Sequence, residues 1–140
     1  MKAYDVFLDF LQTKNLKMTN QRKVILTILL KSNKHLSIEE LYNNVKMVDS
    51  SIGHATVFRT MKLLVEAEIA STIDFGDRIT RYEITYGHAH HDHLVCVSCG
   101  KFIETENGEL SELQHKLQEN YNFTMLRHKI QILGICEECK

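Results

Sequence analysis

The sequence predicts an α+β protein with a helical first half that ends in a β-hairpin and a smaller second half of mixed helix and strand. Apolar residues recur at helical spacing as far as residue 70, and strand-like runs then flank Gly76-Asp77. Several short helices followed by a hairpin form the order of a winged helix-turn-helix domain. We therefore expect one domain over residues 1–84 and a second, small α/β domain over residues 85–140.

Four helices are expected in the first half. The apolar stripe of residues 3–14 predicts the first, and Thr19, a good N-cap residue, precedes the second. Ser37, with Glu40 three residues later, forms the capping-box pattern at the start of the third. The fourth helix is expected over residues 54–70.

The fourth helix has one apolar face and one charged face. The inner side is formed by Val57, Met61, Leu64 and Val65. Arg59 and Lys62 point away from it. A helix that enters the major groove of DNA presents basic side chains in this way, although any small helical domain can carry such a pair.

Composition restricts the class of protein. The chain has 140 residues, 44% of them hydrophobic, and a formal net charge of −1, as in ordinary soluble domains. No apolar run approaches the roughly 20 residues that cross a bilayer, and the N-terminus does not resemble a signal peptide. We therefore expect a cytoplasmic protein without a membrane partner. Six basic residues and no acidic ones occur from Lys14 to Lys34. Concentrated positive charge attracts polyanions such as nucleic acid. A solvated helix surface is the alternative, and this run alone does not decide between the two.

The second half is expected to form a strand and turn over residues 93–105, an amphipathic helix over 109–121 and a strand over 123–135. Such a small unit buries little apolar surface by itself. We therefore expect it to depend on a metal ion or a partner subunit.

All the cysteines of the chain lie in two C-x-x-C pairs, Cys96 with Cys99 and Cys136 with Cys139. Two such pairs supply the four thiolates of a tetrahedral zinc site, which leaves no open position for catalysis. Disulfides are the alternative, but they are rare in the cytosol. We therefore predict a structural zinc site that stabilises the fold.

Histidines cluster just before the first cysteine pair, in the stretch HAHHDH at residues 88–93. If residues 90–97 are extended, His91 and His93 face one side, and His90 and Asp92 face the other. Two sites rich in nitrogen and oxygen would suit Fe(II), Mn(II), Zn(II) or Ni(II), and a surface cluster is the plain alternative. The H-x-H-x-D-H spacing also resembles metallo-β-lactamase-type zinc hydrolases, so a metal-dependent hydrolase is the rival hypothesis. That fold is larger and needs further distant ligands, for which only His115 and His128 remain downstream.

Four stretches, in order, resemble the ferric uptake regulator family of metal-dependent transcriptional repressors. They are LKMTNQRKVIL, HLSIEELY, IGHATVFRTMKLL and HHDHLVCVSCGKFIE, and the resemblance covers nearly the whole chain. It implies a winged-helix DNA-binding domain joined to an α/β dimerisation domain. It further implies a homodimeric repressor, without enzymatic turnover or a small-molecule substrate, that controls metal uptake. Loaded with Fe(II), such a repressor binds A/T-rich inverted-repeat operators.

The resemblance also implies roles for individual residues. Structural Zn(II) would be held by Cys96, Cys99, Cys136 and Cys139. The regulatory metal would be held by His35, Glu83, His91, His93 and Glu104, which come from both domains. A further metal site would use His90, Asp92 and His128. DNA would be contacted by Lys17, Arg22, Thr56, Phe58 and Arg59.

Three positions depart from the family pattern. Glu104 stands where peroxide-sensing members usually carry aspartate, which favours an iron sensor, with zinc-sensing and manganese-sensing branches left open. Phe58 replaces the usual tyrosine but keeps a ring that can pack on a thymine methyl group. Ser111 occupies the place of an expected acidic ligand of the further site.

Overall fold

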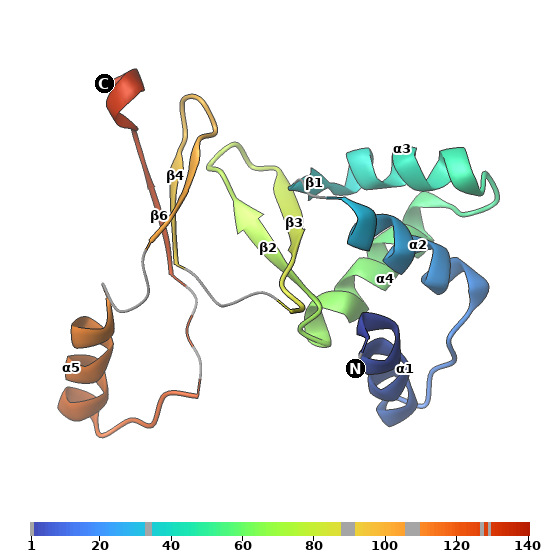
Figure 1. The fold of residues 1–140 in the computed structure, drawn as a ribbon, viewed down its shortest axis with the longest axis horizontal. Coiled ribbons are helices and arrows are strands. Elements are labelled where there is room, and N and C mark those ends of the chain that lie inside the picture. Colours follow the sequence, from blue (N-terminus) through green and yellow to red (C-terminus); the bar gives the residue numbers. More distant parts are fainter. Residues whose placement is uncertain (1, 33–34, 88–91, 106–109, 127, 129) are drawn as a thin grey trace. The chain divides into compact units, whose positions relative to one another are not determined.

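The computed structural model describes residues 1–140 except 1, 33–34, 88–91, 106–109, 127 and 129 (Figure 1). The chain divides into two compact units, which are described separately. The first unit comprises Met1–Asp74 and Arg78–His88, and the second comprises Phe75–Asp77 and Ala89–Lys140. Within the described residues, no helix combines the length and apolar character needed to cross a membrane.

Four helices build most of the first unit, and their starts follow the predicted capping residues. They are α1 (Ala3–Thr13), α2 (Asn20–Lys31), α3 (Ile38–Val48) and α4 (His54–Glu66). The Thr19 hydroxyl accepts the Arg22 backbone N–H at 3.2 Å, as an N-cap does. Ser37 and Glu40 form the complete capping box, because each side chain accepts the backbone N–H of the other.

A three-stranded antiparallel sheet completes the first unit. Its strands are β1 (Leu36–Ser37), β2 (Ala70–Asp74) and β3 (Thr80–Ile84), in the order β1-β3-β2. The predicted hairpin is confirmed, but its loop covers residues 75–79 rather than the Gly76-Asp77 pair alone. Helix α4 ends at Glu66, earlier than predicted, because Glu68 adopts a left-handed φ of 62° and the chain turns into β2.

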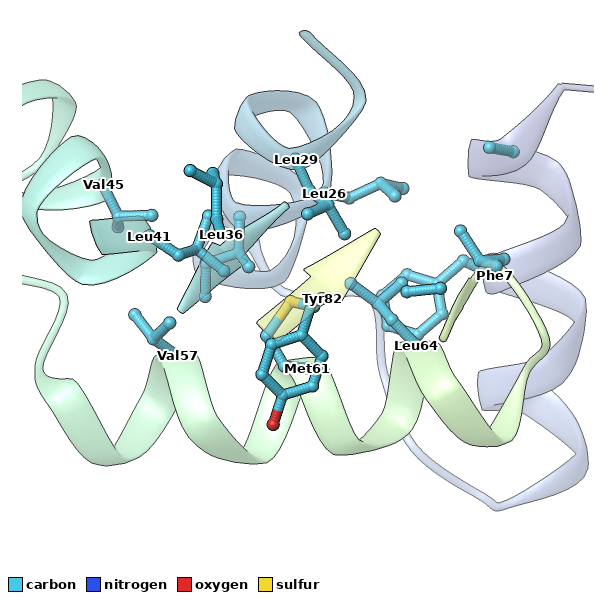
Figure 2. Packing of buried hydrophobic residues seen from close by; sticks show 14 of the residues in the cluster. Phe7, Leu26, Leu29, Leu36, Leu41, Val45, Val57, Met61, Leu64 and Tyr82 are labelled. Carbon is cyan, nitrogen blue, oxygen red and sulfur yellow. The ribbon is translucent and has the colours of Figure 1, made fainter. Parts of the chain in front are cut away.

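The core of the first unit lies between α4 and the other elements. Figure 2 shows side chains from several helices and from β3 gathered above α4, whose row of apolar residues runs along the helix. The predicted inner face is confirmed at Val57, Met61 and Leu64, which are fully buried. Val65, also predicted to lie on it, is partly buried and packs against the core. Thr60 is buried beside them, which the apolar pattern did not indicate. This packing presents the opposite face of α4 to solvent.

The described residues of the second unit form a small sheet, one α-helix and a short 3₁₀ helix. Its elements are β4 (His93–Cys96), β5 (Phe102–Glu104), α5 (Ser111–Tyr121), β6 (Gln131–Gly134) and a 3₁₀ helix (Glu137–Cys139). The strand order is β5-β4-β6, with β5 antiparallel and β6 parallel to β4. The strand predicted for residues 123–135 is thus much shorter. Helices and strands occur in both units, and the predicted α+β class is confirmed.

Candidate metal centres and nucleic-acid interface

The four cysteines converge in the second unit. Cys96 ends β4 and the following turn brings Cys99 back towards it, whereas Cys136 immediately precedes the 3₁₀ helix and Cys139 is its last residue. Parallel pairing places Cys96 opposite Gly134, which brings the C-terminal pair alongside the first pair. The four Sγ atoms lie within 4.8 Å of one another. Four sulfurs at this spacing fit Zn(II), which takes thiolate ligands in tetrahedral geometry.

Backbone N–H groups prepare the cluster for a cation. The amides of Cys99 and Cys136 donate to the buried Cys96 Sγ at 3.5 and 3.3 Å, and these bonds lower the pKa of that thiol to about 6. The Lys101 amide donates to Cys99 Sγ at 3.4 Å, which alone would lower the Cys99 pKa. Hydrogen bonding with the neighbouring thiols nevertheless raises the Cys99 pKa to about 12, and Cys96 has the largest effect among them. Backbone N–H groups therefore stabilise the thiolate form of Cys96, and a bound cation would favour thiolate ligands.

Two of the expected regulatory ligands meet in the first unit. His35 Nε2 lies 3.1 Å from Glu83 Oε2, with side-chain exposures of 28% and 19%. His35 immediately precedes β1, and β1 pairs with β3, the strand that carries Glu83. The sheet therefore brings together two residues that are 48 positions apart in the sequence. An imidazole and a carboxylate held at this distance can bind a divalent first-row metal.

Two further expected regulatory ligands are neighbours in the second unit. The antiparallel register of β4 and β5 places His93 directly opposite Glu104. The His93 ring also packs on Phe102, with 4.2 Å between ring centroids. His91, the remaining expected ligand, lies outside the described residues.

The side chains of Asp92 and His128, two residues of the expected further site, are in contact. His128 Nε2 lies 3.2 Å from Asp92 Oδ1. The Asp92 carbonyl accepts both the N–H and the hydroxyl of Thr105, at 2.9 and 3.1 Å, which fixes the backbone at this position. His128 lies before β6 rather than within it. His90 lies outside the described residues, as does most of the HAHHDH stretch on which the hydrolase alternative depends.

The exposed face of α4 carries the expected DNA contacts. Phe58 is 51% exposed and Arg59 is exposed, whereas Thr56 is partly buried. An exposed phenylalanine on an otherwise well-packed helix is available to a partner, and DNA offers it thymine methyl groups.

Lys17 and Arg22 lie at the linker between α1 and α2. Lys17 is exposed in the linker. The Arg22 guanidinium donates to the Lys17 carbonyl, so it ties the linker to the first turn of α2. Sequence reasoning assigned both residues to DNA, and this hydrogen bond between them was not foreseen.

Two polar contacts near these sites were missed by the sequence analysis. His54 Nε2, at the start of α4, lies 2.6 Å from Glu39 Oε1 of α3, and Ser71 of β2 donates to Glu83 at 3.3 Å. The first contact joins two helices at their starts. The second depends on the exact register of the hairpin, which the sequence leaves open.

The sequence profile of the ferric uptake regulator family matches residues 13–133. This chain belongs to that family. The Ferric uptake regulation protein of Campylobacter jejuni is 39% identical over 142 residues, which cover 97% of this chain and 90% of that protein. The Helicobacter pylori ferric uptake regulator Fur, in which three functional metal binding sites were described, matches with a TM-score of 0.78 and 27% identity over 99% of this chain and 94% of that chain. The Peroxide-responsive repressor PerR of Staphylococcus aureus is 26% identical over 130 residues, covering 93% of this chain and 86% of that protein.

Membership of the ferric uptake regulator family makes this chain a metal-responsive regulator. The two units match the arrangement of Fur structures, which combine an N-terminal DNA-binding domain with a C-terminal dimerisation domain. Winged-helix features, namely α4 and the β2–β3 hairpin, lie in the first unit, and the cysteine cluster lies in the second. The family members are transcription regulators.

Proposed function

We propose that this protein represses metal-uptake genes as a cytoplasmic homodimer that binds A/T-rich inverted-repeat operators when loaded with Fe(II). The observation that carries the proposal is the meeting of His35 and Glu83, 3.1 Å apart, on the sheet that forms the wing. Metal ligands built into a DNA-binding unit provide a direct physical route from metal binding to DNA binding. The domains we propose are residues 1–84 for DNA binding and 85–140 for dimerisation.

DNA contact is proposed for the exposed face of α4 and the linker before α2. Arg59 would take guanine or a phosphate, and Phe58 would pack on a thymine methyl group in the major groove, with Thr56 beside them. Lys17 would neutralise a phosphate or reach the minor groove, with Arg22 at the base of the same linker. The support is the exposure of Phe58, Arg59 and Lys17 in the first unit.

We propose His35, Glu83, His91, His93 and Glu104 as ligands of the regulatory metal. A bound divalent ion supplies a positive centre that these imidazoles and carboxylates share. This proposal is supported by the 3.1 Å contact of His35 with Glu83 and by the strand register that places His93 opposite Glu104. Ligands that belong to the DNA-binding unit would couple metal binding to operator binding. The difference in metal-binding free energy between the operator-bound and the free protein is the coupling free energy.

Two further metal sites are proposed in the second unit. Cys96, Cys99, Cys136 and Cys139 would hold structural Zn(II), supported by Sγ atoms within 4.8 Å of one another. Asp92 and His128, with His90, would form the additional site, supported by the 3.2 Å distance between Asp92 Oδ1 and His128 Nε2. Ser111 supplies no carboxylate to that site, so its affinity should be the weakest of the three.

The homodimer is supported by the apolar surface of the second unit. Among the described residues of this unit, only Val95 and Cys96 are buried apolar side chains. Leu113 and Leu117, one helical turn apart on α5, are 51% and 48% exposed. A unit with so little core and an uncovered leucine stripe is typical of a subunit that completes its core with a partner.

Iron is favoured over other regulatory signals by the ligand set and by the relatives. Glu104 replaces the aspartate usual in peroxide-sensing members, and the Campylobacter jejuni ferric uptake protein is 39% identical against 26% for the peroxide-responsive repressor. Mn(II) and Zn(II) remain the alternative co-repressors, because nitrogen and oxygen ligands accept all three ions.

The test is a DNA-binding titration of the zinc-loaded full-length protein on an A/T-rich inverted repeat and on a scrambled duplex. Anaerobic Fe(II), Mn(II) and Zn(II) are compared with no added metal. We expect Fe(II) to tighten binding to the repeat, and Arg59→Ala to lose specific binding while it retains metal. Equal affinity with and without every metal would contradict the proposal. Ester or β-lactam hydrolysis that disappears in His91→Ala would instead support the zinc-hydrolase alternative.

A further inference from the structure

Three polar side chains form a hydrogen-bonded chain across the sheet of the first unit. Glu83 lies in the middle: its Oε2 lies 3.1 Å from His35 Nε2, and its Oε1 accepts the Ser71 hydroxyl at 3.3 Å. The β2–β3 register makes Ser71 and Glu83 direct partners, so their side chains project from the same face of the hairpin. His35 reaches Glu83 from the segment that leads into β1, on the other side of β3.

The two carboxylate oxygens of Glu83 thus have separate neighbours. A glutamate side chain has several rotatable bonds, and ordering it costs conformational free energy when it becomes a ligand. An ionised carboxylate only accepts hydrogen bonds, so a hydroxyl donor at one oxygen orients the group without competing for the other. In this arrangement Ser71 binds Oε1, and Oε2 is the oxygen that faces the His35 imidazole.

We infer that Ser71 is a positioning residue of the regulatory metal site, which acts by holding Glu83 in the orientation that leaves Oε2 for metal. The inference rests on the proposed function, in which His35 and Glu83 are ligands. Loss of a hydrogen-bond partner of a metal ligand commonly lowers metal affinity by roughly 10-fold to 100-fold. The Ser71 hydroxyl is neutral and its bond is long, so we expect the lower end of that range.

A purely structural role for Ser71 makes a different prediction. If the serine only stabilised the hairpin, its loss would lower the melting temperature and weaken operator binding even at saturating metal. A positioning residue instead shifts the metal concentration that is required and leaves the loaded protein intact. Metal affinity and operator affinity at saturation therefore separate the two roles.

The experiment uses zinc-loaded full-length protein and Mn(II), a redox-stable probe of the regulatory site. Variants are Ser71→Ala, Ser71→Thr, which keeps the hydroxyl, and the matched control Thr80→Ala at an exposed position of β3. We expect Ser71→Ala to raise the Mn(II) dissociation constant roughly tenfold. Ser71→Thr should restore most of the affinity and Thr80→Ala should not change it. Operator affinity at saturating Mn(II) and the zinc content should match the unmodified protein throughout.

An unchanged Mn(II) dissociation constant in Ser71→Ala would overturn the inference, and so would a weakened operator affinity that saturating Mn(II) does not restore. Glu83→Gln and His35→Ala identify which claim has failed. If both weaken Mn(II) binding and Ser71→Ala does not, only the role of Ser71 is wrong. If neither weakens it, the proposed regulatory site is itself wrong.

Discussion

At the scale of single residues, Arg22 shows how one side chain can have two plausible roles. Its backbone N–H is capped by Thr19, and its guanidinium donates to the Lys17 carbonyl. An arginine that binds a phosphate acts directly, whereas an arginine that fixes a linker acts through the residue that the linker carries. The hydrogen bond favours the second role, in which Arg22 holds Lys17 ready for DNA.

A double-mutant cycle separates these roles. We predict that Lys17→Ala weakens binding to all duplexes and lowers the salt dependence of the association constant by about 0.9 in logarithmic slope. Arg22→Ala should cost much less in the Lys17→Ala background than alone, because it acts through Lys17. Fluorescence anisotropy across a range of salt concentrations measures both effects. Additive losses, each with its own reduction in slope, would mean that Arg22 contacts a phosphate directly.

At the scale of elements, local signals in the sequence predicted the helices well. Thr19 and Ser37 cap the helices that follow them, and the apolar face of α4 lies where helical periodicity places it. These features depend on residues within a turn or two of one another, so a single sequence contains them.

Features set by pairing over longer distances were not predictable. A two-residue turn at Gly76-Asp77 would pair Ser71 with Tyr82, but the longer loop pairs it with Glu83. Since a shift of one residue moves a side chain to the other face, the contact between Ser71 and Glu83 could not be inferred. Strand β1 has only two residues, too few for any alternation to reveal it. The proximity of His35 and Glu83 was expected from the family resemblance, not from their positions in the sequence.

The capping box of α3 provides a prediction at this scale. Ser37→Ala should lower the free energy of unfolding by about 1 kcal/mol, because it removes the acceptor for the Glu40 backbone N–H. Ser50→Ala, in the exposed turn between α3 and α4, is the control and should leave stability nearly unchanged. Urea denaturation followed by the helical circular dichroism signal measures the difference. Equal stability of the two variants would show that the cap contributes little.

At the scale of the whole molecule, the stability of the second unit should depend on a bound metal ion and on a partner subunit. Its described residues bury few apolar side chains, and its C-terminal segment joins the sheet through β6 and the cysteine cluster. Metal binding and subunit association are therefore expected to supply much of its stability.

Removal of one thiol tests this dependence. Cys96→Ser should release zinc and dissociate the dimer, because Cys96 is the sulfur that accepts backbone N–H groups from both cysteine pairs. Thr124→Ala, at an exposed position of the same unit, should retain both zinc and the dimer. Zinc analysis and sedimentation velocity are the measurements. A Cys96→Ser protein that stays dimeric with its zinc would refute the structural role.

The central claim is that metal and operator bind cooperatively, and thermodynamic linkage tests it most directly. If metal raises operator affinity by some factor, operator must raise metal affinity by the same factor. The measurement is the Mn(II) dissociation constant of the zinc-loaded protein, alone and saturated with the inverted-repeat duplex. We predict tighter Mn(II) binding on the duplex, by the factor that Mn(II) contributes to operator affinity, and loss of the effect in Glu83→Gln. The same Mn(II) affinity with and without operator would contradict metal-gated repression.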